Sequence, residues 1–213
     1  MASPRRVGAE KSETRRALLD CVEQLMRDEG YPAVTYRAVA AKAGVTAGLV
    51  QYYFPTLDDL FIAAIRRRSE QNLARLAEAL RTKADQPLRL LWKYSRDEST
   101  AALTTEFLAL GNHRKSIQSE IAKVTERVRR LQLDALSAKL GKKGVDFGRL
   151  SPAALLFLLT GIPKLIRLEA GVGVSTAHSE VVKAFEQYLE SVEPSVGARR
   201  RKPSAGRSKK RRA

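Results

Sequence analysis

The sequence is poor in the residues that most often carry catalysis, bind metals or cross-link small folds. It has a single cysteine, Cys21, and only two histidines, His113 and His178, in 213 residues. One cysteine excludes an internal disulfide and is typical of a reducing, cytoplasmic environment. No glycine-rich phosphate loop and no spacing that would pair a nucleophile with a base are present. We therefore predict a protein that is not an enzyme and has no metal or other cofactor.

Long hydrophobic runs are also missing. The nearest is "AALLFLLTGI" at 153–162, which Pro163 and Lys164 end well short of the ~18 apolar residues that a membrane helix needs. The N-terminal "MASPRRVGAEKSETRR" lacks the apolar core of a secretory signal. We expect a soluble protein without a membrane partner.

Positive charge is abundant. Lys and Arg number 39 against 23 acids, for a net charge of +16 and a pI near 10.3. Such an excess favours a polyanionic partner, with nucleic acid first and an anionic membrane surface second. The last fifteen residues hold nine Lys or Arg and no acid. We interpret 195–213 as a disordered basic tail and 1–11 as a disordered N-terminus.

Apolar residues recur at helical spacing along almost the whole chain. In the first segment Leu18, Val22, Leu25 and Met26 form one stripe, which Gly30 ends. No strand-like alternation of useful length appears, so the fold class is predicted as all-α with about nine helices. The expected helices are 12–29, 35–43, 46–53, 57–81, 88–96, 99–112, 116–140, 151–170 and 176–193, with a loop at 141–149.

The segment "TYRAVAAKAGVTAGLVQYYF" at 35–54 has the pattern of a helix-turn-helix. Thr35 and Thr46 are suited to N-cap two short helices, and Gly44 lies where the chain must turn. A structural helix hairpin needs the same glycine and small residues, so that alternative stays open. In a helix-turn-helix, the second helix enters the major groove of DNA.

Each exposed residue of the second short helix suits a DNA contact. Ala47 and Gly48 let the backbone approach, Leu49 suits a thymine methyl, and Gln51 suits an adenine edge. Tyr52 and Tyr53 are long enough to donate to phosphates. The N-terminus of the first short helix is a further phosphate site. The full predicted DNA-binding set is Thr35, Tyr36, Arg37, Thr46, Ala47, Gly48, Leu49, Gln51, Tyr52 and Tyr53.

The first sixty-odd residues resemble the TetR family of bacterial transcriptional regulators. The resemblance lies in "T-x-R-x-V-A-x-x-A-G-V-T-x-G-x-V-x-x-Y-F" followed by "DDLF" at 58–61. It implies a helix-turn-helix DNA-binding domain at 12–56 and a helical effector-binding and dimerisation domain at 57–194. Two residues depart from the family pattern. The family often has Tyr where Gln51 stands, and a phosphate-binding Lys where Leu57 stands.

The later helices supply candidates for a dimer interface and an effector site. Helix 151–170 is apolar around much of its surface, as in a shared four-helix interface or a central helix. The expected interface residues are Leu155, Leu159, Ile162, Ile166, Val181, Phe185, Tyr188 and Leu189. The candidate effector contacts are Trp92, Tyr94, Glu106, Phe107, Asn112, His113 and Phe157, for which ordinary core packing is the alternative.

Together these features predict a ligand-responsive, homodimeric regulator, a repressor that binds a palindromic DNA operator and is released by a small-molecule effector. Two alternatives remain at this point. One is a constitutive or nucleoid-associated DNA-binding protein without an effector. The other is an interaction or membrane-surface protein that acts through its basic tail.

Overall fold

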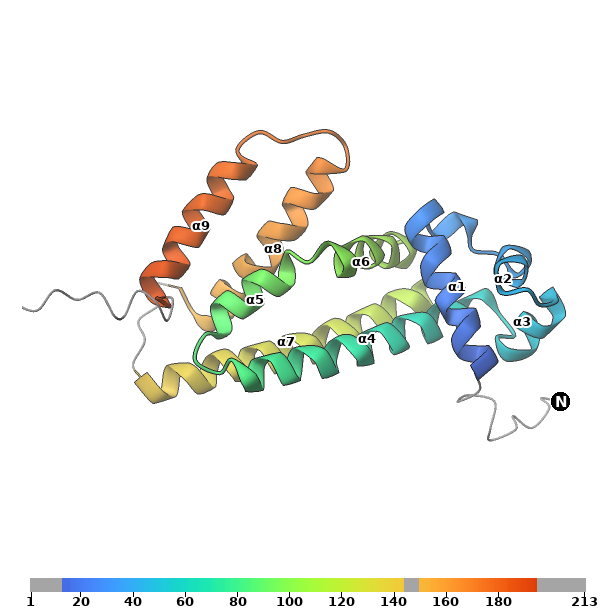
Figure 1. Ribbon diagram of the computed structural model, residues 1–213, viewed down its shortest axis with the longest axis horizontal. Helices are drawn as coiled ribbons and strands as arrows, with labels where there is room; N and C mark the ends of the chain where they lie inside the picture. Colours follow the sequence, from blue (N-terminus) through green and yellow to red (C-terminus); the bar gives the residue numbers. More distant parts are fainter. Residues whose placement is uncertain (1–12, 144–149, 195–213) are drawn as a thin grey trace, which may run out of the picture.

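A computed structural model of the chain describes residues 13–143 and 150–194. All regular elements in these two ranges are helical, as expected from the sequence (Figure 1). They are α1 (Glu13–Glu29), the 3-10 helix η2 (Tyr31–Ala33), α2 (Tyr36–Ala43), α3 (Ala47–Tyr53), α4 (Leu57–Thr82), α5 (Pro87–Ser95), α6 (Glu98–Gly111), α7 (Lys115–Lys143), α8 (Pro152–Ala170) and α9 (His178–Val192). The predicted disordered N-terminus and basic tail lie outside the described residues.

The observed helices differ from the expected ones by more than one residue in three places. η2 was not expected, because three residues are too few to show periodicity. α7 continues to Lys143, so residues 141–143 of the expected loop are helical, and residues 144–149 lie outside the described residues. α9 begins at His178 rather than residue 176, after Ala177 in a left-handed conformation with φ of 65°.

Two hydrophobic cores lie along the length of the molecule. In Figure 1, α1, α2 and α3 form one end, while α5, α8 and α9 gather toward the other. α4 and α7 pack side by side and connect the two ends. The first core is built on α1–α3 and the second on α5, α8 and α9, with α4 and α7 contributing to both.

The first core does not stop at residue 56, where the DNA-binding domain was expected to end. Leu60 and Phe61 of α4 belong to it. So do Leu103 and Phe107 of α6, together with Ile117 of α7, all nearly or fully buried. Helices α1–α3, which the sequence predicts to bind DNA, therefore share one continuous core with helices from the rest of the chain.

Charged groups tie α4 to its neighbours along one side of the first core. Arg66 donates to both carboxylate oxygens of Glu120 on α7, at 2.8 Å each. Arg67 donates to Glu23 of α1 at 2.7 Å, and the carboxyl of Glu23 is almost buried. The hydrogen bond from Arg66 lowers the pKa of Glu120, which keeps this carboxylate ionised. α4 is thus held to the helices on both sides of it.

None of the helices in 13–143 or 150–194 is long and hydrophobic enough to cross a bilayer. Over the same ranges, no three histidine, cysteine or acidic side chains come together as metal ligands.

Candidate DNA-binding surface

The two short helices α2 and α3 are set by their caps and by one glycine. The Thr35 hydroxyl accepts from the backbone N–H of Ala38 at 3.1 Å, and the Thr46 hydroxyl accepts from that of Leu49 at 3.3 Å. Both hydroxyls satisfy amides that the first helical turn leaves free. Gly44 between the helices has φ of 67°, in the left-handed region that a side chain disfavours. The predicted caps and turn are confirmed.

Tyr36, the first residue of α2, links α2 to the end of α3 through a hydrogen bond. Its hydroxyl donates to the carbonyl of Phe54, just beyond the end of α3, at 2.9 Å. Burial, with a smaller contribution from Asp59, raises the pKa of this phenol. The hydroxyl is therefore occupied in fixing α3 against α2, and any phosphate contact at this position falls to the backbone.

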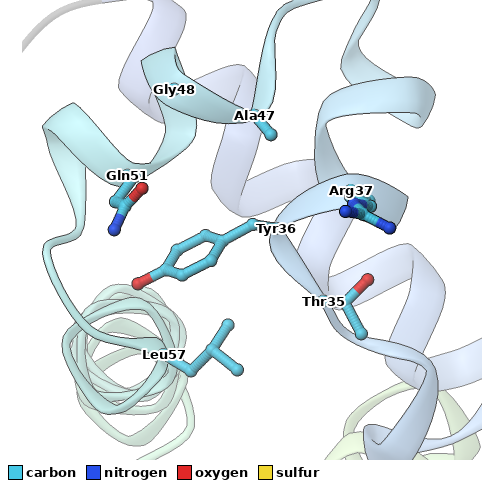
Figure 2. A pocket seen from close by; sticks show the side chains of 7 residues that line it. All are labelled: Thr35, Tyr36, Arg37, Ala47, Gly48, Gln51 and Leu57. Carbon is cyan, nitrogen blue, oxygen red and sulfur yellow. The ribbon is translucent and has the colours of Figure 1, made fainter.

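Six of the ten predicted DNA-binding residues line a shallow hollow between α2, α3 and the start of α4, here called the α2–α3 hollow (Figure 2). Its volume is about 590 Å³. In the view of Figure 2, the ring of Tyr36 extends between the side chains of Gln51 and Leu57. The residues that line it are Thr35, Tyr36, Arg37, Ala47, Gly48, Gln51 and Leu57. Leu57 was noted in the sequence only as a departure from the family, not as part of the surface.

The outer face of α3 is exposed and its inner face is buried. Val50 is fully buried, whereas Gln51 is exposed and Tyr52 is 63% exposed. Tyr53 is half-buried and packs edge-on against Tyr52, with ring centroids 5.5 Å apart. α3 itself carries no formal charge, and Arg37 is the one charged residue that lines the hollow. This face offers hydrogen-bonding and apolar groups rather than a cationic patch.

The residues expected to bind an effector do not come together. Trp92 lies in the second core, with its ring 4.7 Å from that of Phe185, and Phe107 lies in the first core. The Tyr94 hydroxyl donates to the backbone of Asn72. Phe157 is 60% exposed on α8. These side chains belong to several environments, because they occupy different faces of their helices.

The polar members of that set are also dispersed. Asn112 and His113 are exposed where α6 ends. Glu106, expected as a pocket acid or a solvated group, instead accepts from the backbone N–H of Tyr31 at 2.7 Å. Asn112 alone lines a second hollow of about 310 Å³, the α6–α7 hollow. The residues around it are Leu108, Gly111, Asn112, Gln118, Ile121, Ala122, Thr125, Glu126 and Arg129.

The expected dimer residues divide between the interior and the surface. Leu155, Leu159 and Leu189 are at most 1% exposed and pack inside the second core, so they cannot form an outer face. Ile162, Ile166, Phe185 and Tyr188 are half-buried. Val181, expected to be buried, is 39% exposed. The sequence missed the most exposed apolar residues of this region, which are Phe157, Leu165, Leu168, Val172 and Val174.

Residues 18–64, which hold α2, α3 and their supports, match the family model described as "Bacterial regulatory proteins, tetR family". Over this segment the chain belongs to the TetR family. It is a DNA-binding transcriptional regulator and its family is not one of enzymes. The match ends within α4, so the family model itself covers the DNA-binding helices and not the later ones.

Individual relatives agree with this assignment. The repressor BepR of Brucella suis is 28% identical over 145 residues, which is 64% of this chain and 68% of BepR. The repressor KstR of Rhodococcus jostii is 38% identical over 61 residues, 29% of each chain. Among solved structures, a transcriptional regulator from Saccharomonospora viridis, crystallised with choline, superposes with a TM-score of 0.68. It is 17% identical, and the match covers 84% of this chain and 97% of that one, which shows a shared fold.

Proposed function

We propose that this TetR-family chain is a homodimeric repressor that binds a palindromic operator and is released by a small-molecule effector. The observation that carries the DNA-binding part is the α2–α3 hollow with the exposed face of α3. Gln51 presents an amide there, beside the small residues Ala47 and Gly48. An amide pairs well with the adenine edge in the major groove, where small neighbours permit close approach.

The surface of α8 and the turn after it support the dimer part of the proposal. Leu165, Leu168 and Val172 are 58%, 54% and 79% exposed, and Phe157 lies on the same helix. Soluble monomers seldom leave so many large apolar side chains together in water. A second copy of the chain would cover them and would also place two α3 helices for two half-sites of one operator.

Effector response is supported less directly. The α6–α7 hollow combines apolar residues such as Leu108 and Ile121 with the polar side chains of Asn112 and Gln118. A mixed lining of this kind is usual in small-molecule sites. A structural neighbour with the same fold was crystallised with choline, which supports ligand binding by this fold and does not identify the ligand of this chain.

The direct test is selection from randomised DNA with the full chain and two variants. Gln51→Ala should relax base preference at one position per half-site, at a cost of about 1–3 kcal/mol. Gln71→Ala, which removes an exposed amide on α4, is the matched control and should return the wild-type consensus. An unchanged consensus for Gln51→Ala would remove Gln51 from base recognition. A wild-type chain with no consensus at all would favour a constitutive, non-specific DNA-binding protein.

A further inference from the structure

The first turn of η2 is capped from a distant helix. Gly30 is the N-cap residue of η2 and has no side chain that can accept a hydrogen bond from it. Glu106 of α6 takes this role instead, since its carboxylate accepts from the backbone N–H of Tyr31 at 2.7 Å, across 75 residues of sequence. A hydrogen bond from an amide to a carboxylate is stronger than one between neutral groups.

The backbone at Gly30 is shaped to receive this carboxylate. Its φ of 81° lies in a region that L side chains rarely adopt. A Cβ at Gly30 would stand 3.4 Å from the Glu106 carboxylate, so the two already meet at contact distance. The link between Glu106 and η2 is therefore a fixed feature of the chain between α1 and α2, not a loose surface contact.

α6 is joined to the DNA-binding helices by more than this hydrogen bond. Leu103, Phe107 and Leu110 of α6 are buried in the core that α1–α3 build. Because packed cores resist continuous deformation, a shift of α6 must be followed by its partners in that core. Glu106 adds a directional constraint, since it holds one specific amide at the junction of α1 and α2.

α6 also lies next to the rest of the molecule. It follows α5, a helix of the second core, after only a short connection. Its last residues, Gly111 among them, line the α6–α7 hollow. A Cβ at Gly111 would approach Ile121 of α7 to 2.8 Å, so the two helices are in close contact there. A ligand that entered between α6 and α7 would have to separate the two helices there.

We propose that Glu106 is a positioning residue that sets the orientation of α1–α3 relative to the α4–α7 pair. Displacing α6 shifts the carboxylate that caps η2, and the DNA-binding helices reorient with it. A role for this coupling in regulating DNA binding rests on the proposed effector response. The coupling itself is a property of the single protomer and is testable without operator or effector.

Spin-label distances measure the orientation directly. In a Cys21→Ala chain, labels at Gln24→Cys on α1 and Ala77→Cys on α4 report the separation of the two helices, because both positions are exposed and no other cysteine is present. Labelled chain is diluted with unlabelled chain to isolate distances within one protomer. Glu106→Ala should shift or broaden the distance distribution. Glu106→Gln keeps an acceptor oxygen and should restore the wild-type distribution.

Operator binding is the second readout. Glu106→Ala should weaken operator binding by about 10-fold, the scale of a lost charge-assisted hydrogen bond, and Glu106→Gln should recover most of it. Glu70→Ala is the control, because Glu70 is an exposed acid on α4 that lines neither hollow. If Glu106→Ala does not fold, Glu106→Asp keeps the charge and shortens its reach, and should also shift the distances.

The outcomes separate this inference from the proposed function. An unchanged distance distribution in Glu106→Ala and Glu106→Asp overturns the coupling, whatever the chain does to DNA. A Glu106→Gln chain as perturbed as Glu106→Ala also overturns it, because the acceptor would then be irrelevant. A wild-type chain without sequence preference defeats the proposed function, while shifted distances would still support the coupling.

Discussion

Leu57 begins α4 and lines the α2–α3 hollow beside Gln51 (Figure 2). An aliphatic side chain at this position leaves the hollow with Arg37 as its charged group. Contacts to phosphate oxygens from this side of the surface then depend on Arg37 and on hydroxyl and amide groups, which form weaker hydrogen bonds than a cation does. Operator binding by this chain should accordingly gain little from charge at the protein–DNA interface itself.

Restoring a cation at this position should have a measurable effect. Leu57→Lys is expected to tighten binding to all DNA sequences and to steepen the dependence of log Kd on log salt by about one unit. The preferred sequence should stay the same, since phosphates carry no base identity. Fluorescence anisotropy over a salt series measures both quantities. Gln71→Lys, an exposed position further along α4, is the control, and equal slopes for the two variants would show that residue 57 does not reach a phosphate.

Residue roles were predictable where they depend on local sequence. Thr35 and Thr46 cap their helices through amides three residues further on, and Gly44 adopts the turn conformation itself. Spacing in the sequence was therefore enough to identify them. The role of Glu106 was not predictable, because its partner Tyr31 lies 75 residues away and nothing in the local pattern marks the pairing. The same limit explains why the hydrogen bond from the Tyr36 hydroxyl to the carbonyl of Phe54, 18 residues away, was not predicted.

At the scale of the element, α8 shows which properties of a helix the spacing of apolar residues can predict. Its bounds agreed with the sequence, since Ser151 and Pro152 begin it and the apolar spacing continues through it. Pro163 lies inside the helix as expected. The sequence did not show which apolar face is internal, because α8 is apolar on more than one side. Leu159 is buried in the protomer, whereas Leu165 on another face is exposed.

The two faces predict opposite consequences for the same substitution. Leu159→Asp should destabilise the fold by about 3–5 kcal/mol, since it places a charge among fully buried side chains. Leu165→Asp should leave the fold intact and yield a monomer, because it charges only the exposed face. Light scattering with urea unfolding distinguishes the two results, and Ala77→Asp on α4 is the surface control. A Leu165→Asp chain that remained a dimer would move the interface away from this face of α8.

The contact between α4 and α7 has a predictable pH dependence. Arg66 lowers the pKa of Glu120, so this carboxylate stabilises the folded chain above its unfolded pKa of about 4.5, and the contribution is lost as pH falls through the lower folded value. Glu120→Gln should therefore lower the urea midpoint more at pH 7 than at pH 4. Glu70→Gln, an exposed acid on α4, supplies the control. An equal loss at both pH values would indicate that the charge of Glu120 is unimportant.

Across the whole molecule, positive charge is concentrated away from the DNA-binding helices. Residues 13–56 hold as many acids as bases, although the full chain carries +16. The overall charge in the sequence pointed correctly to nucleic acid, but not to the surface that contacts it. Long-range attraction to DNA must then come largely from the remainder of the chain. We therefore expect sequence-specific contacts and general electrostatic attraction to come from separate parts of this protein.

Removing the basic C-terminal segment tests this division. A chain that ends at Val196 loses the nine cations of the last fifteen residues. It should bind operator and unrelated DNA more weakly by similar factors, with a shallower salt dependence and an unchanged consensus. Anisotropy titrations with both DNAs give the salt slopes. Equal slopes for the full and shortened chains would mean that this segment does not contact DNA.

The shared core of α1–α3 with α4, α6 and α7 has a consequence for protein engineering. Leu60, Phe61, Leu103, Phe107 and Ile117 all contribute to the core that contains the helix-turn-helix. A fragment cut at residue 56 would leave the apolar sides of α1–α3 in water, and so small a chain has little other surface to bury. The helix-turn-helix of this protein is therefore not a transplantable module, and a chimera must carry α4, α6 and the start of α7 with it.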